Sequence, residues 1–176
     1  MHYLAGLLAN AQATTPFTTP TINGYRRYRA NSLAPDRATW AYDHRGVMAR
    51  VLGAPHDPAT RIENRIGEPS ANPYLYIAAQ IVSGLDGIAN KREPGPQELN
   101  PYNSDFPLLP KTLPDALAAL ESSDLFRAQF GETFITYFLA FKRTELGRYE
   151  KWKTENPGHN ADEPTEWEQN EYFDYF

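Results

Sequence analysis

The 176-residue sequence contains no cysteine, and this absence removes three kinds of chemistry from the chain. A disulfide scaffold, a thiolate metal site and a cysteine nucleophile all require a thiol. Several short catalytic motifs are missing as well: there is no GxxxxGK[ST], no GxGxxG after a strand, no HExxH and no GxSxG. The four histidines show no metal-ligand spacing. Carboxylates and arginines therefore remain as the candidates for a functional site.

The sequence also has little excess charge, with a formal net charge of −5. A protein that binds the phosphate backbone of a nucleic acid needs a concentrated basic surface, so we expect no nucleic-acid partner. The apolar run over residues 3–8 is too short to span a bilayer and has no basic leader before it. We therefore expect no membrane association and a cytoplasmic location.

Apolar residues at helical spacing predict a helix over residues 3–13. Asn72 followed by Pro73 has the pattern of an N-cap and a first helical position. Thr112 with Asp115 resembles a capping box at the start of another helix. Two more helices are predicted over residues 123–129 and 130–153, the second with an aromatic face formed by Phe130, Phe134, Tyr137, Phe138 and Phe141.

Between the first two helices the pattern predicts loops and short strands. Residues 14–38 are rich in threonine and proline and predict a long ordered loop. Residues 38–52 predict two strands around a turn near Asp43–Gly46, and residues 60–66 alternate as a strand does. We therefore expect an α+β fold of short antiparallel strands packed with helices, with residues 1–111 followed by a helical segment, 112–176, of the same domain.

A cluster of arginines extends from Arg26 to Arg65 and coincides with the predicted strands. On the strand at 60–66, Arg61, Glu63 and Arg65 point to one face, about 6.5–7 Å apart. One interpretation is a solvated face with weak cross-strand ion pairs. The other is a site in which Glu63 helps to hold a hard cation while arginines bind phosphate or carboxylate oxygens. Glu63 alone cannot hold the ion, so further ligands must come from elsewhere.

Three segments resemble the glutamine synthetase family. FTTPTINGYRRY (17–28) is similar to the family's FTNPTVNSYKRL, and TWAYDHRGVMAR (39–50) is similar to a strand turn that carries two arginines in NRSASIR. RIENRIGEPSANPYLYIAAQIVSGLDGI (61–88) is similar to RIEVRxPDPSANPYLALAALLAAGLDGI. The resemblance is strong over residues 3–92 and weaker over 112–176, and it implies the C-terminal part of a glutamine synthetase-type catalytic domain.

The resemblance implies an ATP-dependent ligase that joins glutamate to ammonia or an amine through γ-glutamyl phosphate. It assigns Glu63 to a metal, Mg²⁺ or Mn²⁺, and Arg27 and Arg65 to the carboxylate of glutamate. Arg45 would contact both glutamate and the transferred phosphate and is the expected catalytic residue. Arg45 and Arg50 would bind ATP. Family membership also implies a homo-oligomer for the full-length enzyme.

Two departures from the family pattern leave alternatives open. Leu33 occupies the position of a glutamate that binds and deprotonates ammonium, and an apolar residue there suits the carbon chain of an organic amine. A γ-glutamyl–organic amine ligase of the polyamine type is therefore an alternative to glutamine synthetase. The chain is also short for the family and lacks its N-terminal segments. We expect the chain alone to be inactive, as a fragment or a regulatory homologue would be.

Overall fold

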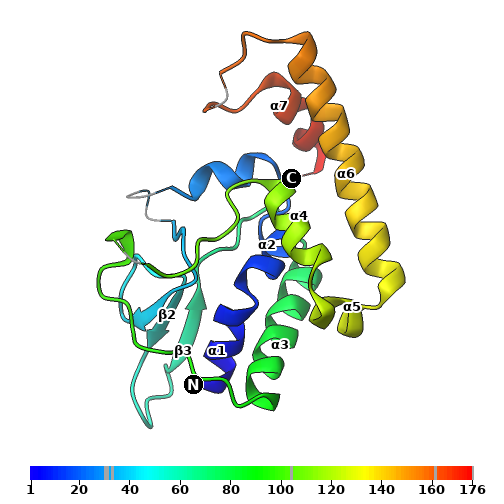
Figure 1. Ribbon diagram of the computed structural model, residues 1–176. Helices are drawn as coiled ribbons and strands as arrows, with labels where there is room; N and C mark the ends of the chain where they lie inside the picture. Colours follow the sequence, from blue (N-terminus) through cyan, green and yellow to red (C-terminus); the bar gives the residue numbers. More distant parts are fainter. Residues whose placement is uncertain (30–31, 33, 104, 161, 176) are drawn as a thin grey trace.

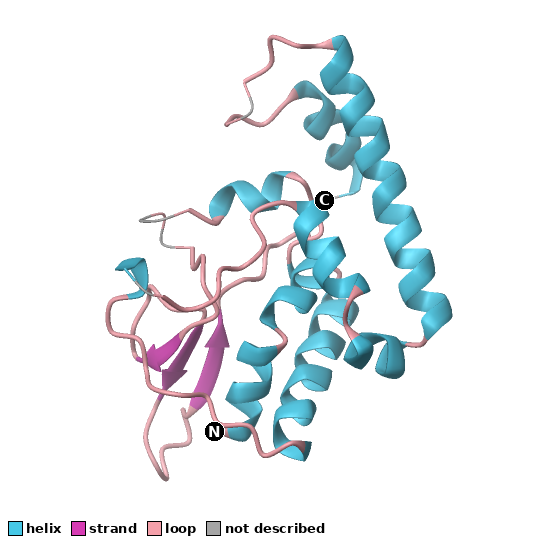
Figure 2. Cartoon of the chain, viewed as in Figure 1, coloured by secondary structure: helices cyan, strands magenta, loops and turns pink. Residues whose placement is uncertain are grey.

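The computed structural model describes residues 1–29, 32, 34–103, 105–160 and 162–175. A small three-stranded sheet lies beside a group of helices, and a long helix with a folded-back tail extends away from them (Figures 1 and 2). The α-helices of the described residues are α1 (His2–Ala9), α2 (Ala11–Thr18), α3 (Pro73–Ala89), α4 (Leu113–Glu121), α5 (Asp124–Phe130), α6 (Glu132–Glu155) and α7 (Glu166–Tyr172). Three short 3₁₀ helices are η1 (Asn23–Arg27), η2 (Pro101–Asn103) and η3 (Phe173–Tyr175).

The first helix extends further than the sequence predicts, after a break at Asn10. The loop predicted over residues 14–38 is wrong at its start, because α2 continues to Thr18 and includes Pro16. The hydroxyl groups of Thr14 and Thr15 donate to the Ala11 carbonyl at 2.8 and 2.9 Å. Phe17 is buried in the core, and this burial outweighs the helical hydrogen bond that proline cannot donate.

The sheet has the order β1 (Trp40–Tyr42), β2 (Ala49–Leu52), β3 (Arg61–Asn64). Strands β2 and β3 are antiparallel, as expected, with Arg50 opposite Glu63. The expectation is wrong for β1 and β2, which run parallel. The connection after β1 is not a tight hairpin, because parallel neighbours require the chain to return to the same end of the sheet before β2 begins. Val47 and Met48, in this connection, are completely buried.

The two predicted N-cap residues, Asn72 and Thr112, are found at the starts of α3 and α4, but the Asp115 carboxylate contacts the Thr112 hydroxyl where a capping box would use the Thr112 backbone N–H. The Asn72 side chain accepts from the backbone N–H groups of Tyr74 and Leu75, with Pro73 in the first turn of α3. The Thr112 hydroxyl accepts from the backbone N–H of Asp115 at 3.3 Å and donates to the Asp115 carboxylate at 2.7 Å. These contacts satisfy backbone donors that have no partner within the helix and fix where α3 and α4 begin.

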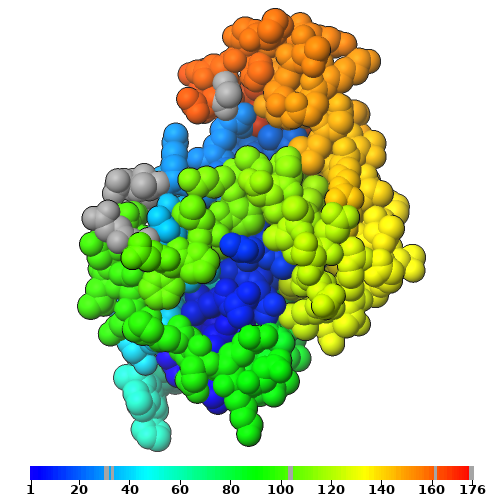
Figure 3. Space-filling view, viewed as in Figure 1, coloured from blue at the N-terminus to red at the C-terminus, as the bar shows by residue number. Residues whose placement is uncertain are grey.

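One hydrophobic core joins helices from both halves of the chain. The ring of Phe17 on α2 lies 4.9–5.6 Å from the rings of Phe126, Phe130 and Phe138 on α5 and α6. Only part of the predicted aromatic face packs into the core: Phe138 is buried, whereas Tyr137 and Phe141 are 68% and 55% exposed. In the space-filling view, blue atoms of the N-terminal helices lie in the centre, surrounded by green and yellow segments from later in the chain (Figure 3).

None of the helices formed by the described residues combines the length and the hydrophobicity needed to cross a bilayer.

Helices α1 and α3 approach each other closely at their glycines. A Cβ atom on Gly87 would lie 2.1 Å from the carbonyl oxygen of His2 and 2.5 Å from the nitrogen of Gly6. A Cβ on Gly84 would lie 2.0 Å from the ring of Tyr3. The glycines of α3 therefore let the two helix backbones pack together, as expected from their cost to an isolated helix.

We expect Gly87→Ala to lower the free energy of unfolding by about 1–3 kcal/mol, because the added methyl group meets the backbone of α1. Urea denaturation measures this change. Gly147→Ala is the matched control, since Gly147 lies inside α6 and a Cβ added there would meet no atom within 4 Å. That control should gain up to about 1 kcal/mol in helix propensity. Equal effects of the two substitutions would contradict the close contact.

Candidate functional site

The antiparallel register of β2 and β3 brings Arg50 and Glu63 together. Arg50 Nη1 lies 3.2 Å from Glu63 Oε2, and the Arg50 guanidinium also contacts the carboxylate of Asp43. The side chain of Arg50 is 17% exposed and that of Glu63 is 43% exposed. The hydrogen bond to Asp43, with a smaller contribution from Glu63, raises the pKa of Arg50. The pair is thus an ordered, charged feature at the edge of a cavity.

Arg65 lines two cavities, one of about 360 Å³ and one of about 440 Å³. The 360 Å³ cavity is lined by Arg45, Arg50, Glu63 and Arg65. The 440 Å³ cavity is lined by Arg27, Arg29, Ser32, Ala34 and Arg65. The structure therefore brings together, around Arg65, the five residues to which the resemblance assigns a binding role: Arg27, Arg45, Arg50, Glu63 and Arg65.

Arg27 is held in place by the chain segment that follows β3. Its Nη1 donates to the Gly67 carbonyl at 3.0 Å and its Nη2 to the Ile66 carbonyl at 3.1 Å. The guanidinium carbon lies 5.6 Å from the ring centroid of Tyr28. Its Nε is buried and has no hydrogen-bond partner among the described residues. Arg27 is thus oriented by backbone carbonyls, and these two bonds use only one of the two N–H groups on each Nη atom.

The same segment is supported by Tyr28. The Tyr28 hydroxyl donates to the Ile66 carbonyl at 2.8 Å and is hydrogen-bonded to the Thr19 hydroxyl. Burial raises the pKa of Tyr28 to about 12. A neutral, buried tyrosine therefore fixes the backbone that in turn fixes Arg27.

The charge of the site suits an anion that carries several oxygen atoms. The charged residues that line the two cavities are one glutamate, Glu63, and five arginines: Arg27, Arg29, Arg45, Arg50 and Arg65. The planar guanidinium group binds phosphate or carboxylate oxygens through two parallel hydrogen bonds. Opposite this excess of positive charge, Glu63 offers one carboxylate.

A divalent cation would need ligands beyond this chain segment. Among the residues that the structure describes, no group of three or more histidine, cysteine, aspartate or glutamate side chains could hold a metal ion. Glu63 supplies a hard oxygen donor of the kind that Mg²⁺ and Mn²⁺ accept. The donor chemistry of Glu63 fits such an ion, and the number of donors does not complete its coordination.

Some site residues were not assigned a role from the sequence. Arg29, Ser32 and Ala34 line the cavity that contains Arg27. Their closeness to Arg27 in the sequence is the signal that could have found them. His44, next to Arg45 in the sequence, accepts a hydrogen bond from the backbone N–H of Gly46 at 3.0 Å and lines neither cavity. Leu33, on which the choice of amine depends, lies outside the described residues.

Comparisons with known proteins identify the family and relatives of the chain. Residues 1–161 match the family model described as glutamine synthetase, catalytic domain. The chain is 55% identical over 176 residues to a γ-glutamylanilide synthase of Acinetobacter sp., covering 97% of this chain and 34% of that protein. It is 37% identical over 183 residues to a glutamine synthetase of Pyrococcus abyssi, covering 98% of this chain and 41% of that protein.

A solved structure of a GmaS/ADP complex has the same fold over this region. Its TM-score is 0.74 at 29% sequence identity, and the match covers 98% of this chain and 39% of that chain. The chain thus spans about a third to two fifths of the length of the relatives it matches.

We expect pyrophosphate to stabilise the chain by binding at the arginines, by about 1.4 kcal/mol at ten times its Kd. Arg45→Gln should remove most of this gain, because Arg45 lines the cavity with Arg50 and Arg65. Arg61→Gln is the matched control, since Arg61 lies on β3 but bonds the Ala59 carbonyl at 2.9 Å and lines neither cavity. Thermal unfolding with and without pyrophosphate measures both. Equal losses in the two variants would contradict binding at this site.

The buried Tyr28 predicts a dependence of stability on alkaline pH. Its folded pKa of about 12 lies above the ordinary tyrosine value of 10.0, so the folded state holds the proton more tightly. The contribution of Tyr28 to the free energy of unfolding, about 2–3 kcal/mol, is complete below pH 10 and is lost as the pH rises from about 10 to 12. Urea denaturation across this range measures the slope. Tyr28→Phe should have a lower free energy of unfolding at pH 7, and this free energy should fall less steeply above pH 10 than in the unsubstituted chain. An unchanged slope would refute the raised pKa of Tyr28.

Proposed function

This chain belongs to the glutamine synthetase catalytic-domain family, and from that premise we propose that it supplies the arginine-rich part of an ATP-dependent glutamate–amine ligase. The observation that supports this proposal most directly is the pair of arginine-lined cavities that share Arg65. Glutamate and the phosphates of ATP are both anions, and the reaction requires them to meet. Adjacent cavities with a common guanidinium group suit that requirement.

Arg27 and Arg65 are proposed to bind the carboxylate of glutamate. Both line the 440 Å³ cavity, and Arg27 is oriented by the carbonyls of Ile66 and Gly67. A guanidinium group that is already fixed loses less conformational entropy when it binds a carboxylate.

Arg45 and Arg50 are proposed to bind the phosphates of ATP, with Arg45 as the catalytic residue. An oxygen of the glutamate γ-carboxylate attacks the γ-phosphorus of ATP and ADP leaves. The amine nitrogen then attacks the γ-carbonyl carbon, phosphate leaves, and the amine loses a proton. Arg45 neutralises charge on the transferred phosphoryl group, and positioning with charge neutralisation supplies most of the catalysis of such transfers.

Glu63 is proposed as one ligand of Mg²⁺ or Mn²⁺. The bound ion would neutralise phosphate charge. Arg50 holds Glu63 at 3.2 Å, at the cavity that we assign to phosphate. The remaining ligands belong to the part of the family that this chain does not span.

An organic amine of the aniline class is the proposed second substrate. The chain is 55% identical to a γ-glutamylanilide synthase and 37% identical to a glutamine synthetase over similar lengths. The apolar Leu33 agrees with this preference, because the corresponding glutamate of ammonium-using relatives attracts and deprotonates NH₄⁺. Ammonium is the second candidate, supported by the glutamine synthetase match. The complete ligase is further proposed to be a cytoplasmic homo-oligomer, as the family implies.

A chimera tests the proposed function. This chain would replace the matching third of the Acinetobacter γ-glutamylanilide synthase, and ADP release would be measured with ATP, glutamate and aniline, ethanolamine or ammonium. We expect aniline to give the highest kcat/KM, with Arg45→Gln lowering kcat by about 100-fold, the scale for removing one preorganised charge donor. Equal turnover with ammonium would favour glutamine synthesis. A folded but inactive chimera, beside an active parent enzyme, would favour a regulatory homologue.

A further inference from the structure

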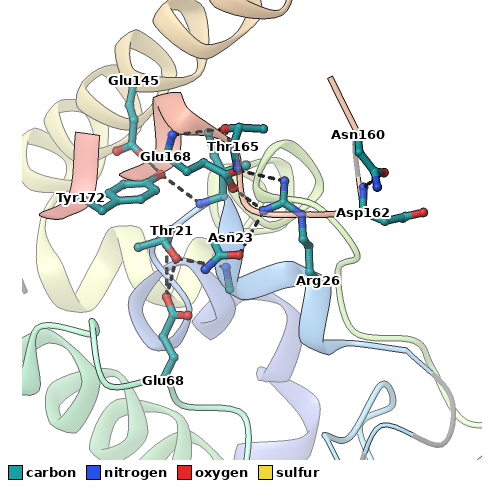
Figure 4. A network of polar contacts seen from close by, with 12 residues as sticks. Thr21, Asn23, Arg26, Glu68, Glu145, Asn160, Asp162, Thr165, Glu168 and Tyr172 are labelled. Atoms are coloured by element: carbon teal, nitrogen blue, oxygen red, sulfur yellow. Dashed lines mark hydrogen bonds and ion pairs between the residues drawn. The ribbon is translucent and has the colours of Figure 1, made fainter. Parts of the chain in front are cut away.

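The backbone segment that carries Arg27 is held from two opposite sides. On the side of the sheet, Arg27 bonds the Ile66 and Gly67 carbonyls, and the Thr21 hydroxyl donates to Glu68 at 3.0 Å. On the other side lies the C-terminal tail, which we define as residues 165–172 (Figure 4). The family match ends at residue 161, so the tail lies beyond it.

The first contact from the tail is a two-pronged ion pair between Glu168 and Arg26. Both guanidinium Nη atoms of Arg26 bond the Glu168 carboxylate, with Nη2 and Oε2 3.0 Å apart. The Glu168 side chain is 3% exposed, and its Oε2 also accepts from the backbone N–H and the hydroxyl of Thr165 at 2.7 and 2.8 Å. Arg26 Nη1 additionally donates to Asn23 at 3.1 Å. The carboxylate is therefore fully used and rigidly placed.

The second contact from the tail is made by Tyr172. Its hydroxyl accepts from the backbone N–H of Ile22 at 3.1 Å and donates to Glu145 Oε1 on α6 at 2.5 Å. Glu145 is buried and paired with Lys142 at 2.7 Å. Burial, and then the charge of Glu145, raise the pKa of Tyr172, so its hydroxyl stays a donor. Together the two contacts fix both ends of η1.

We propose that the C-terminal tail positions the substrate arginine Arg27, with Glu168 and Tyr172 as positioning residues that act through η1. Arg26 and Arg27 are consecutive, and the five residues of η1 leave little freedom between the tail contact and the cavity. Without the Glu168 contact, the backbone of η1 would be free to move. The Ile66 and Gly67 carbonyls bond only the guanidinium group of Arg27, so they do not hold its backbone. The role of Arg27 in substrate binding rests on the proposed function. The coupling of η1 to the C-terminal tail rests on the contacts described above.

The same tail helix provides a matched control. Glu171 pairs with Arg148 and so ties α7 to α6, but no contact of Glu171 with residues 22–27 is present in the described chain. Glu171→Gln therefore weakens the attachment of the tail in general, whereas Glu168→Gln removes the charge that faces η1. A tail with a purely structural role would respond similarly to both substitutions.

The coupling is tested by hydrogen–deuterium exchange on the full 176-residue chain. We expect Glu168→Gln to raise exchange at residues 22–28 by about tenfold, and Glu171→Gln to change it less than about twofold. Tyr172→Phe, which keeps the ring and loses the hydrogen bonds to Ile22 and Glu145, should change the same peptide in the same direction. This second variant keeps the test decisive if Glu168→Gln fails to fold. Faster exchange confined to residues 165–172 would overturn the coupling.

The consequence for substrate is tested in the chimeric ligase. We expect Glu168→Gln to raise the KM for glutamate about tenfold with kcat within about twofold, because the arginine is displaced and the phosphate site is not. Glu168→Asp, which keeps the charge, should recover part of the loss. If Arg27→Lys raises this KM and Glu168→Gln does not, the positioning role is wrong. If both variants leave the KM unchanged while exchange at residues 22–28 rises, the proposed role of Arg27 fails and the coupling stands.

Discussion

The antiparallel pairing of β2 with β3 is the constraint on which the site depends. This register sets Arg50 opposite Glu63, and the backbone N–H of Arg65, just after β3, donates to the Met48 carbonyl at 2.9 Å. A shift by one residue would turn these side chains to the other face, where Ile62 packs against the core. Two short strands thus decide that charged residues from separate segments line one cavity.

The segment after β3 extends this order to a region far away in the sequence. Its carbonyls at Ile66 and Gly67 orient Arg27, and the Ile66 carbonyl also accepts from Tyr28. Glu68 continues the pattern by accepting from Thr21. Side-chain hydrogen bonds therefore join the loop before β1 to the loop after β3 and bring the arginines that they carry to one site.

Helices α1 and α3 provide a rigid support next to the sheet. Their close approach depends on glycines at the contact, since a Cβ on Gly6 would lie 2.0 Å from the Ser83 carbonyl oxygen. The sheet has only three strands of three or four residues each. The helices, the aromatic cluster around Phe17 and the strands together form the one core that holds the cavities open to a ligand.

The sequence by itself predicted α3 to α6, a strand over residues 60–66 that the structure has at Arg61–Asn64, and the identity of the charged residues. Caps such as Asn72 and periodic patterns are local signals, so they can be recognised without the rest of the fold. The motif around Glu63 pointed to the family for the same reason.

Tertiary structure alone decided the continuation of α2 through Pro16 and the parallel pairing of β1 with β2. Both depend on burial, of Phe17 in one case and of Val47 and Met48 in the other, and burial depends on partners far away in the chain. The same holds for the pairing of Arg26 with Glu168, which are separated by 142 positions and meet only because α7 folds back against η1.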